Sequence, residues 1–463
     1  MDNRYVVLFK DTLIFALGGL GSKIILFLMV PLYTNFMTAE EYGIADLVFT
    51  VAQFLTPIVS VVIHDAIVRY GLSKNTKKED VLLVGYIIFL LDVLVIILIT
   101  PLLGIYPTLT KWQWYLCLYS ILCISDSIEF NYLKVCRKNK LYAIFSIIKT
   151  ALMASLNVLF LAFWHIGISG YLMANIIALG ITDIIVFLIG GYFKDLQKAS
   201  FNRKLFLEMI CYSTPLILNN ISWWIIQSSN KVMVEYLIGA TALGIYTVAA
   251  KIPALINVII TIFSQAWGIS SITEYENSND MLFYSKVFRF YIVIVCATCI
   301  IYISFTKIFM NYYVGVTFYS AWQYVPLLLV SAVFSSISSF YGSLYGALKK
   351  SVNNMISTAI SAAVSIMISV LLIPILGIWG AVLSTVVAYI VIAIYRLIDV
   401  GRFMNITIHW SVFVINCIIV ILQAVLVSFD IAGYIVSIIA SIAFVVNNRV
   451  TLNELIRTLS AKF

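Results

Sequence analysis

The feature that most constrains this chain is a succession of long apolar segments with few charges. A helix that crosses a bilayer needs about 20 mostly apolar residues, and the chain holds fourteen segments near that length. In hydrocarbon only helices and closed barrels satisfy their own backbone hydrogen bonds, and these segments lack the alternation of barrel strands. We therefore predict an all-α integral membrane protein with about 14 transmembrane helices, at residues 12–35, 44–68, 81–103, 113–135, 141–163, 168–192, 205–229, 241–270, 287–310, 321–346, 355–375, 378–398, 408–428 and 431–447.

Composition supports this class. With 62% hydrophobic and 11% charged residues, the chain has too few polar side chains to cover a soluble globule of 463 residues. The first segment is longer than the core of a signal peptide, contains Lys23 and Pro31, and is not followed by an A-x-A cleavage pattern. We expect it to remain as the first span.

Lys and Arg are unevenly distributed between the connections. With the N-terminus inside, the outer connections hold only Lys111, Lys231 and Lys307, whereas the inner ones hold Arg69, Lys74, Lys77, Lys78, Lys134, Arg137, Lys138, Lys140, Lys194, Lys198, Arg203, Lys204, Lys349 and Lys350. Because positive residues stay on the cytoplasmic side, both termini are predicted to be cytoplasmic. The net charge of +8 then reflects topology, and no nucleic-acid partner is expected.

Two pairs of segments indicate an internal repeat. Gly167 begins GISGYLMANIIA and Gly377 begins GIWGAVLSTVVA, while Met37 begins MTAEEYGI and Ile238 begins IGATALGI. Six predicted spans separate the copies, so the halves are parallel repeats. We expect a six-helix bundle at residues 1–200, a second at 201–403, and an appended helix pair with a cytoplasmic tail at 404–463. Two such bundles would enclose a central cavity that opens to either side, as in a transporter.

Motifs for chemistry are absent from the sequence. It contains no P-loop, nucleotide fingerprint, metal-ligand cluster or nucleophile elbow, so we expect no enzyme activity, no cofactor and no metal. The seven cysteines are scattered through apolar segments, and Cys296 and Cys299, although they form a CxxC, are expected to serve packing. The tail from Val450 is expected to form a surface helix or a frayed end.

Three cations fall inside predicted spans, where a charge is costly and suggests a function. Lys23 lies in span 1 and Lys251 in span 8; because the repeat sets spans 1 and 2 opposite spans 7 and 8, both could face the cavity, where they would favour an anionic substrate such as a phosphate. Lys149 lies in the inner third of span 5. The alternative is that these lysines pair with acids at the same depth, namely Asp92, Asp126, Glu129 and Asp183.

A histidine and two charges lie close together near the inner end of span 2. The spacing from Asp65 to Arg69 suits an ion pair within one helix, and His64 beside a carboxylate could carry a coupling proton. We therefore count His64 and Asp65, together with the four acids above, as candidates for ion coupling.

Two further spans carry polar side chains. Span 7 contains Pro215, Asn219 and Asn220, which predict a bent, cavity-lining helix that could act as a gate; packing by small polar groups is the alternative. Span 11 carries a stripe of serines at four-residue spacing, which favours close helix packing over substrate contact: Ser357, Ser361, Ser365 and Ser369.

The stretch PLYTNFMTAEEYGIADLVF from Pro31 to Phe49, followed by IHDAIVRYG ending at Gly71, resembles the polysaccharide transporter family of bacterial flippases, often called Wzx-like. That family's first outer turn tends to combine a proline with E-x-Y-G, and its second span tends to end in an arginine. The matching residues here are Pro31, Glu40, Tyr42, Gly43 and Arg69.

This resemblance implies a fold of the multidrug/oligosaccharidyl-lipid/polysaccharide exporter (MOP) superfamily in the bacterial cytoplasmic membrane. It implies movement of undecaprenyl-diphosphate-linked oligosaccharides from the inner to the outer leaflet, for capsule, exopolysaccharide or O-antigen assembly. Its cationic cavity would use Lys23, Lys251, Lys149 and Arg69, and the appended spans would form a groove for the lipid tail. A proton or sodium gradient could drive the cycle, and a polymerase with chain-length machinery could be partners.

Three alternatives remain from the sequence. A cation-coupled multidrug exporter of the same superfamily would have acids and aromatics in its cavity in place of lysines. A membrane-embedded polymerase or acyltransferase is disfavoured by the short outer loops. A major-facilitator transporter would need a charged glycine-rich motif between spans 2 and 3, and RYGLSKNTKKED does not supply one.

Overall fold

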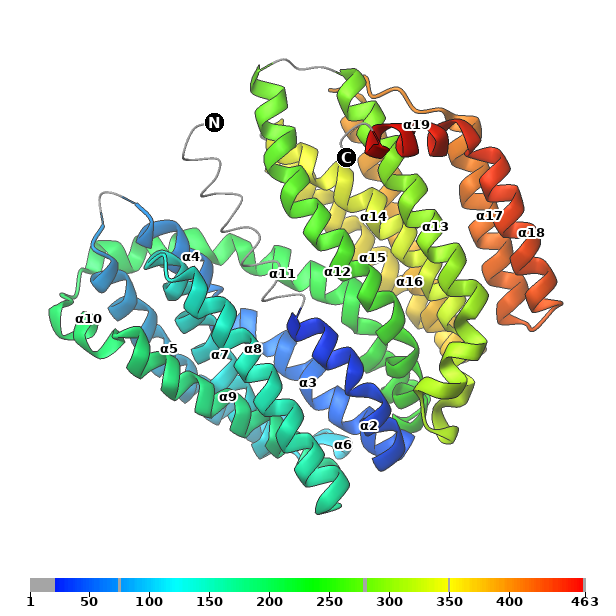
Figure 1. The fold of residues 1–463 in the computed structure, drawn as a ribbon. Helices are drawn as coiled ribbons and strands as arrows, with labels where there is room; N and C mark the ends of the chain where they lie inside the picture. Colours follow the sequence, from blue (N-terminus) through cyan, green and yellow to red (C-terminus); the bar gives the residue numbers. More distant parts are fainter. Residues whose placement is uncertain (1–20, 74–75, 278–280, 349, 461–463) are drawn as a thin grey trace. The chain divides into compact units, whose positions relative to one another are not determined.

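The computed structural model describes residues 21–73, 76–277, 281–348 and 350–460 (Figure 1). Over these residues the chain is helical and contains no β-strand. It forms two compact units, residues 1–224 and 225–463, which are described separately below. Residues 12–20 of the predicted first span lie outside the described part.

The first unit contains nine helices and the start of a tenth over its described residues. Residues Gly21–Phe36 form an apolar helix that ends in α2 (Val30–Phe36). The others are α3 (Ala39–Val59), α4 (Ile63–Gly71), α5 (Lys78–Leu103), α6 (Pro107–Thr110), α7 (Gln113–Val135), α8 (Asn139–Asn157) with a π-helical turn at Val158–Phe163, α9 (Ile168–Gly190), α10 (Tyr192–Lys198) and α11 (Arg203–Leu237), which runs past the division at Trp224.

The second unit continues with long helices. They are α12 (Ala240–Asn277), α13 (Met281–Tyr313), a 3-10 segment at Val316–Gln323, α14 (Val325–Ala347), α15 (Ser351–Leu376), α16 (Ile378–Gly401), α17 (Trp410–Ser428), α18 (Gly433–Asn447) and α19 (Arg449–Ser460). The last helix occupies the tail for which the sequence left a surface helix or a frayed end open, and the structure favours the helix.

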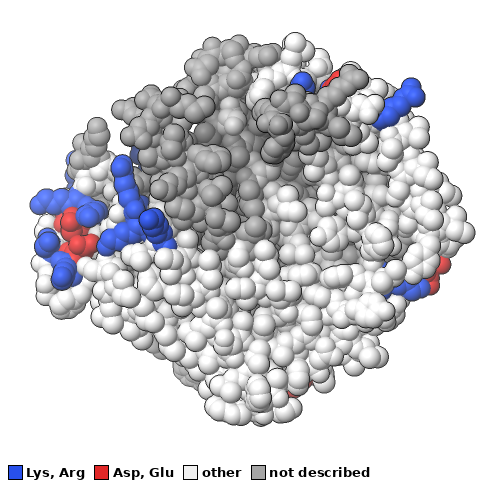
Figure 2. Space-filling model, in the orientation of Figure 1, with Lys and Arg blue, Asp and Glu red and all other residues white. Residues whose placement is uncertain are grey.

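Among the described residues, ten helices are long and apolar enough to cross a membrane, and two shorter apolar ones are Gly21–Phe36 and Gly433–Asn447. The helices α7 and α11 are also long, with 23 and 35 residues, but are more polar. Together they account for the predicted fourteen spans and confirm a multi-pass, all-α membrane protein. In the view of Figure 2 most of the described surface carries no charged side chain, as contact with lipid requires.

The predicted second span is interrupted. Instead of one helix over residues 44–68, the chain forms α3 and α4 with a break at residues 60–62. Val61 and Val62 have φ angles of 49° and 54°, a left-handed conformation that is costly for β-branched residues. Pro57 precedes the break and weakens the hydrogen-bond ladder there. The apolar pattern gave no sign of this interruption, because it continues through both helices.

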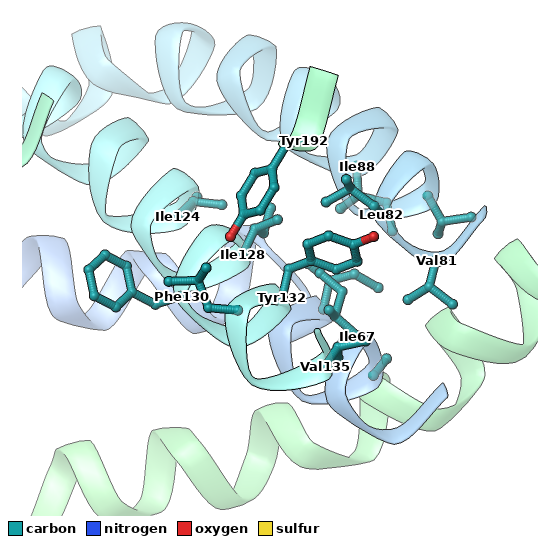
Figure 3. Close-up of a cluster of buried hydrophobic side chains, with 14 of the residues drawn as sticks. Ile67, Val81, Leu82, Ile88, Ile124, Ile128, Phe130, Tyr132, Val135 and Tyr192 are labelled. Atoms are coloured by element: carbon teal, nitrogen blue, oxygen red, sulfur yellow. The ribbon is translucent and has the colours of Figure 1, made fainter. Parts of the chain in front are cut away.

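A buried apolar cluster joins α4, α5, α7 and α10 in the first unit (Figure 3). Two tyrosines at its centre, Tyr132 and Tyr192, are fully buried and pack edge to face with their ring centroids 5.1 Å apart. Their hydroxyls donate to Asp195 at 2.9 Å and to the main-chain carbonyl of Glu129 at 2.7 Å. Because both hydroxyls have partners, the rings can be buried at one end of the helix bundle without an unsatisfied polar group.

In the second unit, α16 packs against both α14 and α15. The four serines of the predicted stripe are fully buried on α15. Ser361 donates to the carbonyl of Ala388 at 2.7 Å, and Ser384 donates to the carbonyl of Ser365 at 2.9 Å. The packing interpretation of the stripe is therefore confirmed, since small hydroxylated side chains let α15 and α16 approach closely.

The repeat found in the sequence has a counterpart in the backbone. Gly167 and Gly377 precede α9 and α16 with nearly identical angles, φ 66° and ψ −140° against φ 61° and ψ −135°. This conformation is essentially restricted to glycine. The other pair also starts helices in register, since α3 begins at Ala39 and α12 at Ala240. The three-part division at residues 200 and 403 stays a prediction.

Candidate functional site

Ionisable side chains gather between α7, α8 and α9 of the first unit. The ammonium of Lys149 lies 2.5 Å from the Oδ1 atom of Asp126 and 4.3 Å from the centroid of the Phe130 ring. The side chains of Lys149 and Asp126 are 25% and 20% exposed. The structure thus pairs Lys149 with one of the acids at membrane depth, which is the alternative that the sequence left open for it.

Two further carboxyls of this cluster lie deeper. Glu129 is 3% exposed; its Oε1 atom accepts from Tyr86 at 3.0 Å and from Ser125 at 3.4 Å, and its Oε2 atom has no hydrogen-bond partner in the described part of the chain. Asp183 is 4% exposed, and neither of its carboxylate oxygens has a described partner. Asp183 is close enough to Asp126, Glu129 and Lys149 to interact with them electrostatically.

The cluster is closed at the end of the bundle where α10 lies. The hydroxyl of Tyr192 contacts the carbonyl of Glu129, and burial raises the pKa of this tyrosine above its usual range, so the hydroxyl remains a donor. Asp92, another acid among the ion-coupling candidates, lies on α5; it is 3% exposed and its Oδ2 atom has no partner among the described residues.

The predicted cavity lysines lie on separate units. Lys23 is exposed on the first described helix of the first unit. Lys251 is half-buried on α12 of the second unit, two residues before Pro253 within that helix.

The side chains of His64, Asp65 and Arg69 on α4 are arranged differently from the prediction. Asp65 lies 3.7 Å from the Nε2 atom of His64, and the expected ion pair between Asp65 and Arg69 is not formed; Arg69 is exposed. Asp65 lies in the first turn of the short helix that follows the break, where side chains point back towards the helix start and so towards His64.

The predicted gate residues lie within one continuous helix, α11, with Pro215 in its interior. The side-chain amide of Asn220 donates to the carbonyl of Leu216 at 3.0 Å, which is a bond within the same helix. Ser213 donates to the carbonyl of Val62 at 3.4 Å, so the segment before Pro215 contacts the break between α3 and α4. Asn219 is half-buried on the same helix.

Two buried polar networks in the second unit were not predicted. Asn230 donates to the carbonyl of Ala381 at 3.2 Å and to Thr385 at 2.8 Å, and accepts from Ser369, which joins α11, α15 and α16. Arg396, 2% exposed on α16, donates to Ser357, Thr358 and the carbonyl of Ser338 at 2.9–3.0 Å. The sequence did contain a signal for the second network, because Arg396 is a cation within the predicted span 378–398.

Comparison with known proteins gives a family. The family described as "Polysaccharide biosynthesis protein" matches residues 8–267, more than half of the chain. The chain belongs to this family. Protein 1 of the Lsg locus of Haemophilus influenzae is 22% identical to this chain over 274 residues. The match covers 56% of this chain and 64% of that relative, less than two thirds of its length.

The solved structures similar to this chain include membrane transporters. The lipid II flippase MurJ in an inward closed conformation aligns with a TM-score of 0.71 at 14% identity, covering 97% of this chain and 100% of that one. An inward-facing multidrug resistance MATE transporter of the MOP superfamily aligns with a TM-score of 0.64 at 15% identity, covering 83% and 94%. These likenesses confirm the MOP fold expected from the sequence.

Proposed function

We propose that this protein is a flippase that moves undecaprenyl-diphosphate-linked oligosaccharide repeat units from the inner to the outer leaflet of the bacterial cytoplasmic membrane. Membership of the polysaccharide biosynthesis family carries this proposal. The likeness of its fold to that of a lipid II flippase supports it. Both termini are cytoplasmic in this proposal, as the distribution of Lys and Arg predicts.

The chemistry of such a substrate explains why cations occur at membrane depth. A diphosphate-sugar head cannot cross hydrocarbon unaided, whereas its polyprenyl tail need not leave it. Lys23 and Lys251 are proposed to bind the diphosphate during alternating access, each as a point charge from one repeat. Arg69, exposed on α4, is proposed to attract the head at the inner surface.

Movement requires a bistable element. The proposed gate is α11 around Pro215, Asn219 and Asn220, because proline removes one backbone hydrogen bond from the helix. The contact between Ser213 and Val62 would carry its bending to the break between α3 and α4. Broken helices of this kind are common at the moving parts of transporters.

A cation-coupled multidrug exporter is the second candidate. The fold likeness to MATE transporters and the buried acids of the first unit favour it. The two functions differ in what the cell loses. A flippase defect removes surface polysaccharide, whereas an exporter defect changes drug sensitivity alone.

The test is deletion of the gene in its host, with surface polysaccharide and the leaflet of any accumulated lipid-linked oligosaccharide as readouts. Loss of polymer with precursor trapped on the inner leaflet is expected. Precursor that reaches the outer leaflet unpolymerised would point to a polymerase, and an unchanged surface would favour the drug exporter.

Complementation of that strain then tests the lysines. Lys23→Gln and Lys251→Gln should each abolish complementation at normal membrane levels, because each removes a charge for the diphosphate. Lys204→Gln is the matched control, since the Lys204 side chain is 86% exposed on α11. Full activity of both test variants would contradict the proposed role.

A further inference from the structure

We propose that Asp183 and Glu129 form a proton-binding site inside the first unit. As a site that couples protons to transport it rests on the function proposed above, whereas proton binding itself does not. The argument uses the charge balance of the cluster, the burial of its carboxyls and the groups that surround them.

The charges of the cluster do not balance. Asp183 interacts electrostatically with two further carboxyls, those of Asp126 and Glu129, and with one ammonium, that of Lys149. Lys149 is bonded to Asp126 at 2.5 Å. With all four groups charged, Glu129 and Asp183 would leave two uncompensated negative charges in the interior of a helix bundle.

Burial makes this imbalance costly. Asp183 and Glu129 are 4% and 3% exposed, and three of their four carboxyl oxygens have no hydrogen-bond partner among the described residues. An isolated ion in such surroundings is costly even after the protein relaxes around it. Uptake of protons removes that cost, because a neutral carboxyl is far cheaper to bury.

A proton suits the site better than a metal ion. Among the described residues, no group of three or more His, Cys, Asp or Glu side chains is placed to hold a metal ion. The ammonium of Lys149 also lies within the cluster and would repel a metal cation. Protons need one oxygen each, and the Oε2 atom of Glu129 and both oxygens of Asp183 are open.

The groups facing Asp183 from neighbouring helices define its environment. They are Asp126, Glu129, Cys123 and Ser125 on α7, Lys149 on α8 and Tyr86 on α5. On α3 the acid that faces α9 is Asp46, which interacts with Tyr171, twelve residues before Asp183 and about 18 Å away along the helix.

Access is one-sided within the unit. Tyr132 and Tyr192, labelled in Figure 3, are both fully buried and close the end at α10. Tyr192 donates to the carbonyl of Glu129. The partly exposed pair of Asp126 and Lys149 therefore forms the way in. A proton that leaves Asp183 creates a carboxylate that competes with Asp126 for Lys149, whose four-carbon stem can turn between them. The protonation state would thus decide where the ammonium points.

The corresponding place in the second repeat shows that this arrangement is not a general feature of the fold. There Ala393 stands at the position of Asp183, and Arg396, about one turn further along α16, lies among hydrogen-bonding groups of α14 and α15, the helices that correspond to α7 and α8. Its neutral partners satisfy it. The buried carboxyl oxygens that have no hydrogen-bond partner among the described residues lie in the first repeat. Such oxygens are available to bind and release a proton.

The test uses dicyclohexylcarbodiimide on the full-length protein in liposomes. A protonated carboxyl adds its O–H across a C=N bond of this apolar reagent, and the adduct rearranges to a stable N-acylurea that mass spectrometry locates. We expect adducts on Asp183 and Glu129 that decline at least about tenfold between about pH 6 and about pH 10.5. Asp183→Asn combined with Glu129→Gln should abolish them, while Asp430→Asn, which alters an exposed acid paired with Lys307, should leave them unchanged.

Three results would overturn the proposal. The first is the absence of adducts at every pH. The second is an adduct yield that does not change with pH, which would mark permanently neutral carboxyls. The third is a lower adduct yield in NaCl than in choline chloride, which would assign the site to sodium. None of these readouts needs a transported substrate. If labelling behaves as expected but gene deletion leaves surface polysaccharide unchanged, the proton site stands and the flippase function fails.

Discussion

The packing of Arg396 makes a stability prediction that can be worked in detail. An added Cβ atom at Gly342 on α14 would collide with the Nη1 atom of Arg396, whose guanidinium is held in place by Ser338, Ser357 and Thr358. Because three hydrogen bonds fix the guanidinium, it cannot move aside cheaply. Gly342→Ala should therefore destabilise the protein by about 1–3 kcal/mol, the usual cost of overpacking.

The partner substitution should behave differently. Arg396→Met removes a buried charge together with its bonds and keeps most of the side-chain volume, and such exchanges are often neutral or stabilising, within about 1 kcal/mol here. The two hydroxyls that it leaves each retain a bond to the carbonyl of Asn354. In the double variant the colliding atom is gone, so Gly342→Ala should cost about 0 kcal/mol, giving a coupling of about 1–3 kcal/mol.

Unfolding in mixed micelles with increasing SDS, followed by circular dichroism, measures all four proteins of this cycle. Gly180→Ala is the matched control, since an added Cβ there meets the Leu122 side chain at an ordinary 3.6 Å. An additive cycle would refute the reasoning, and so would a large loss of stability in Arg396→Met alone.

Three further outcomes are expected in the same assay. At Val62, whose left-handed backbone favours glycine, Val62→Gly should be more stable than Val62→Ala by about 1 kcal/mol, the reverse of the order inside a helix. Gly167→Ala and Gly377→Ala should each cost about 1–3 kcal/mol through backbone strain, and a cost at only one would contradict their equivalence. Asn230→Leu should cost about 2 kcal/mol, because three interhelical hydrogen bonds are lost at about 0.6 kcal/mol each; a neutral effect would show that the network is dispensable.

Much of the fold could be predicted because its signals are local. Apolar length alone marks a membrane span, so the all-α class and the number of spans followed from counting residues. The repeat was visible because Gly167 and Gly377 occupy a backbone conformation that essentially only glycine adopts, which preserves them in register. The membership of the polysaccharide biosynthesis family followed from short motifs around Pro31 and Gly43.

What the sequence left open depends on which side chains meet. The sequence placed Lys149 and four acids at membrane depth, but only packing decided that Lys149 pairs with Asp126 and that Asp183 has no partner among the described residues. The break at Val62 is likewise a tertiary result, because its apolar pattern fits a continuous helix. Burial in hydrocarbon is a property of each segment, whereas pairing of charges is a property of the space between segments, and that space exists only once the helices are packed.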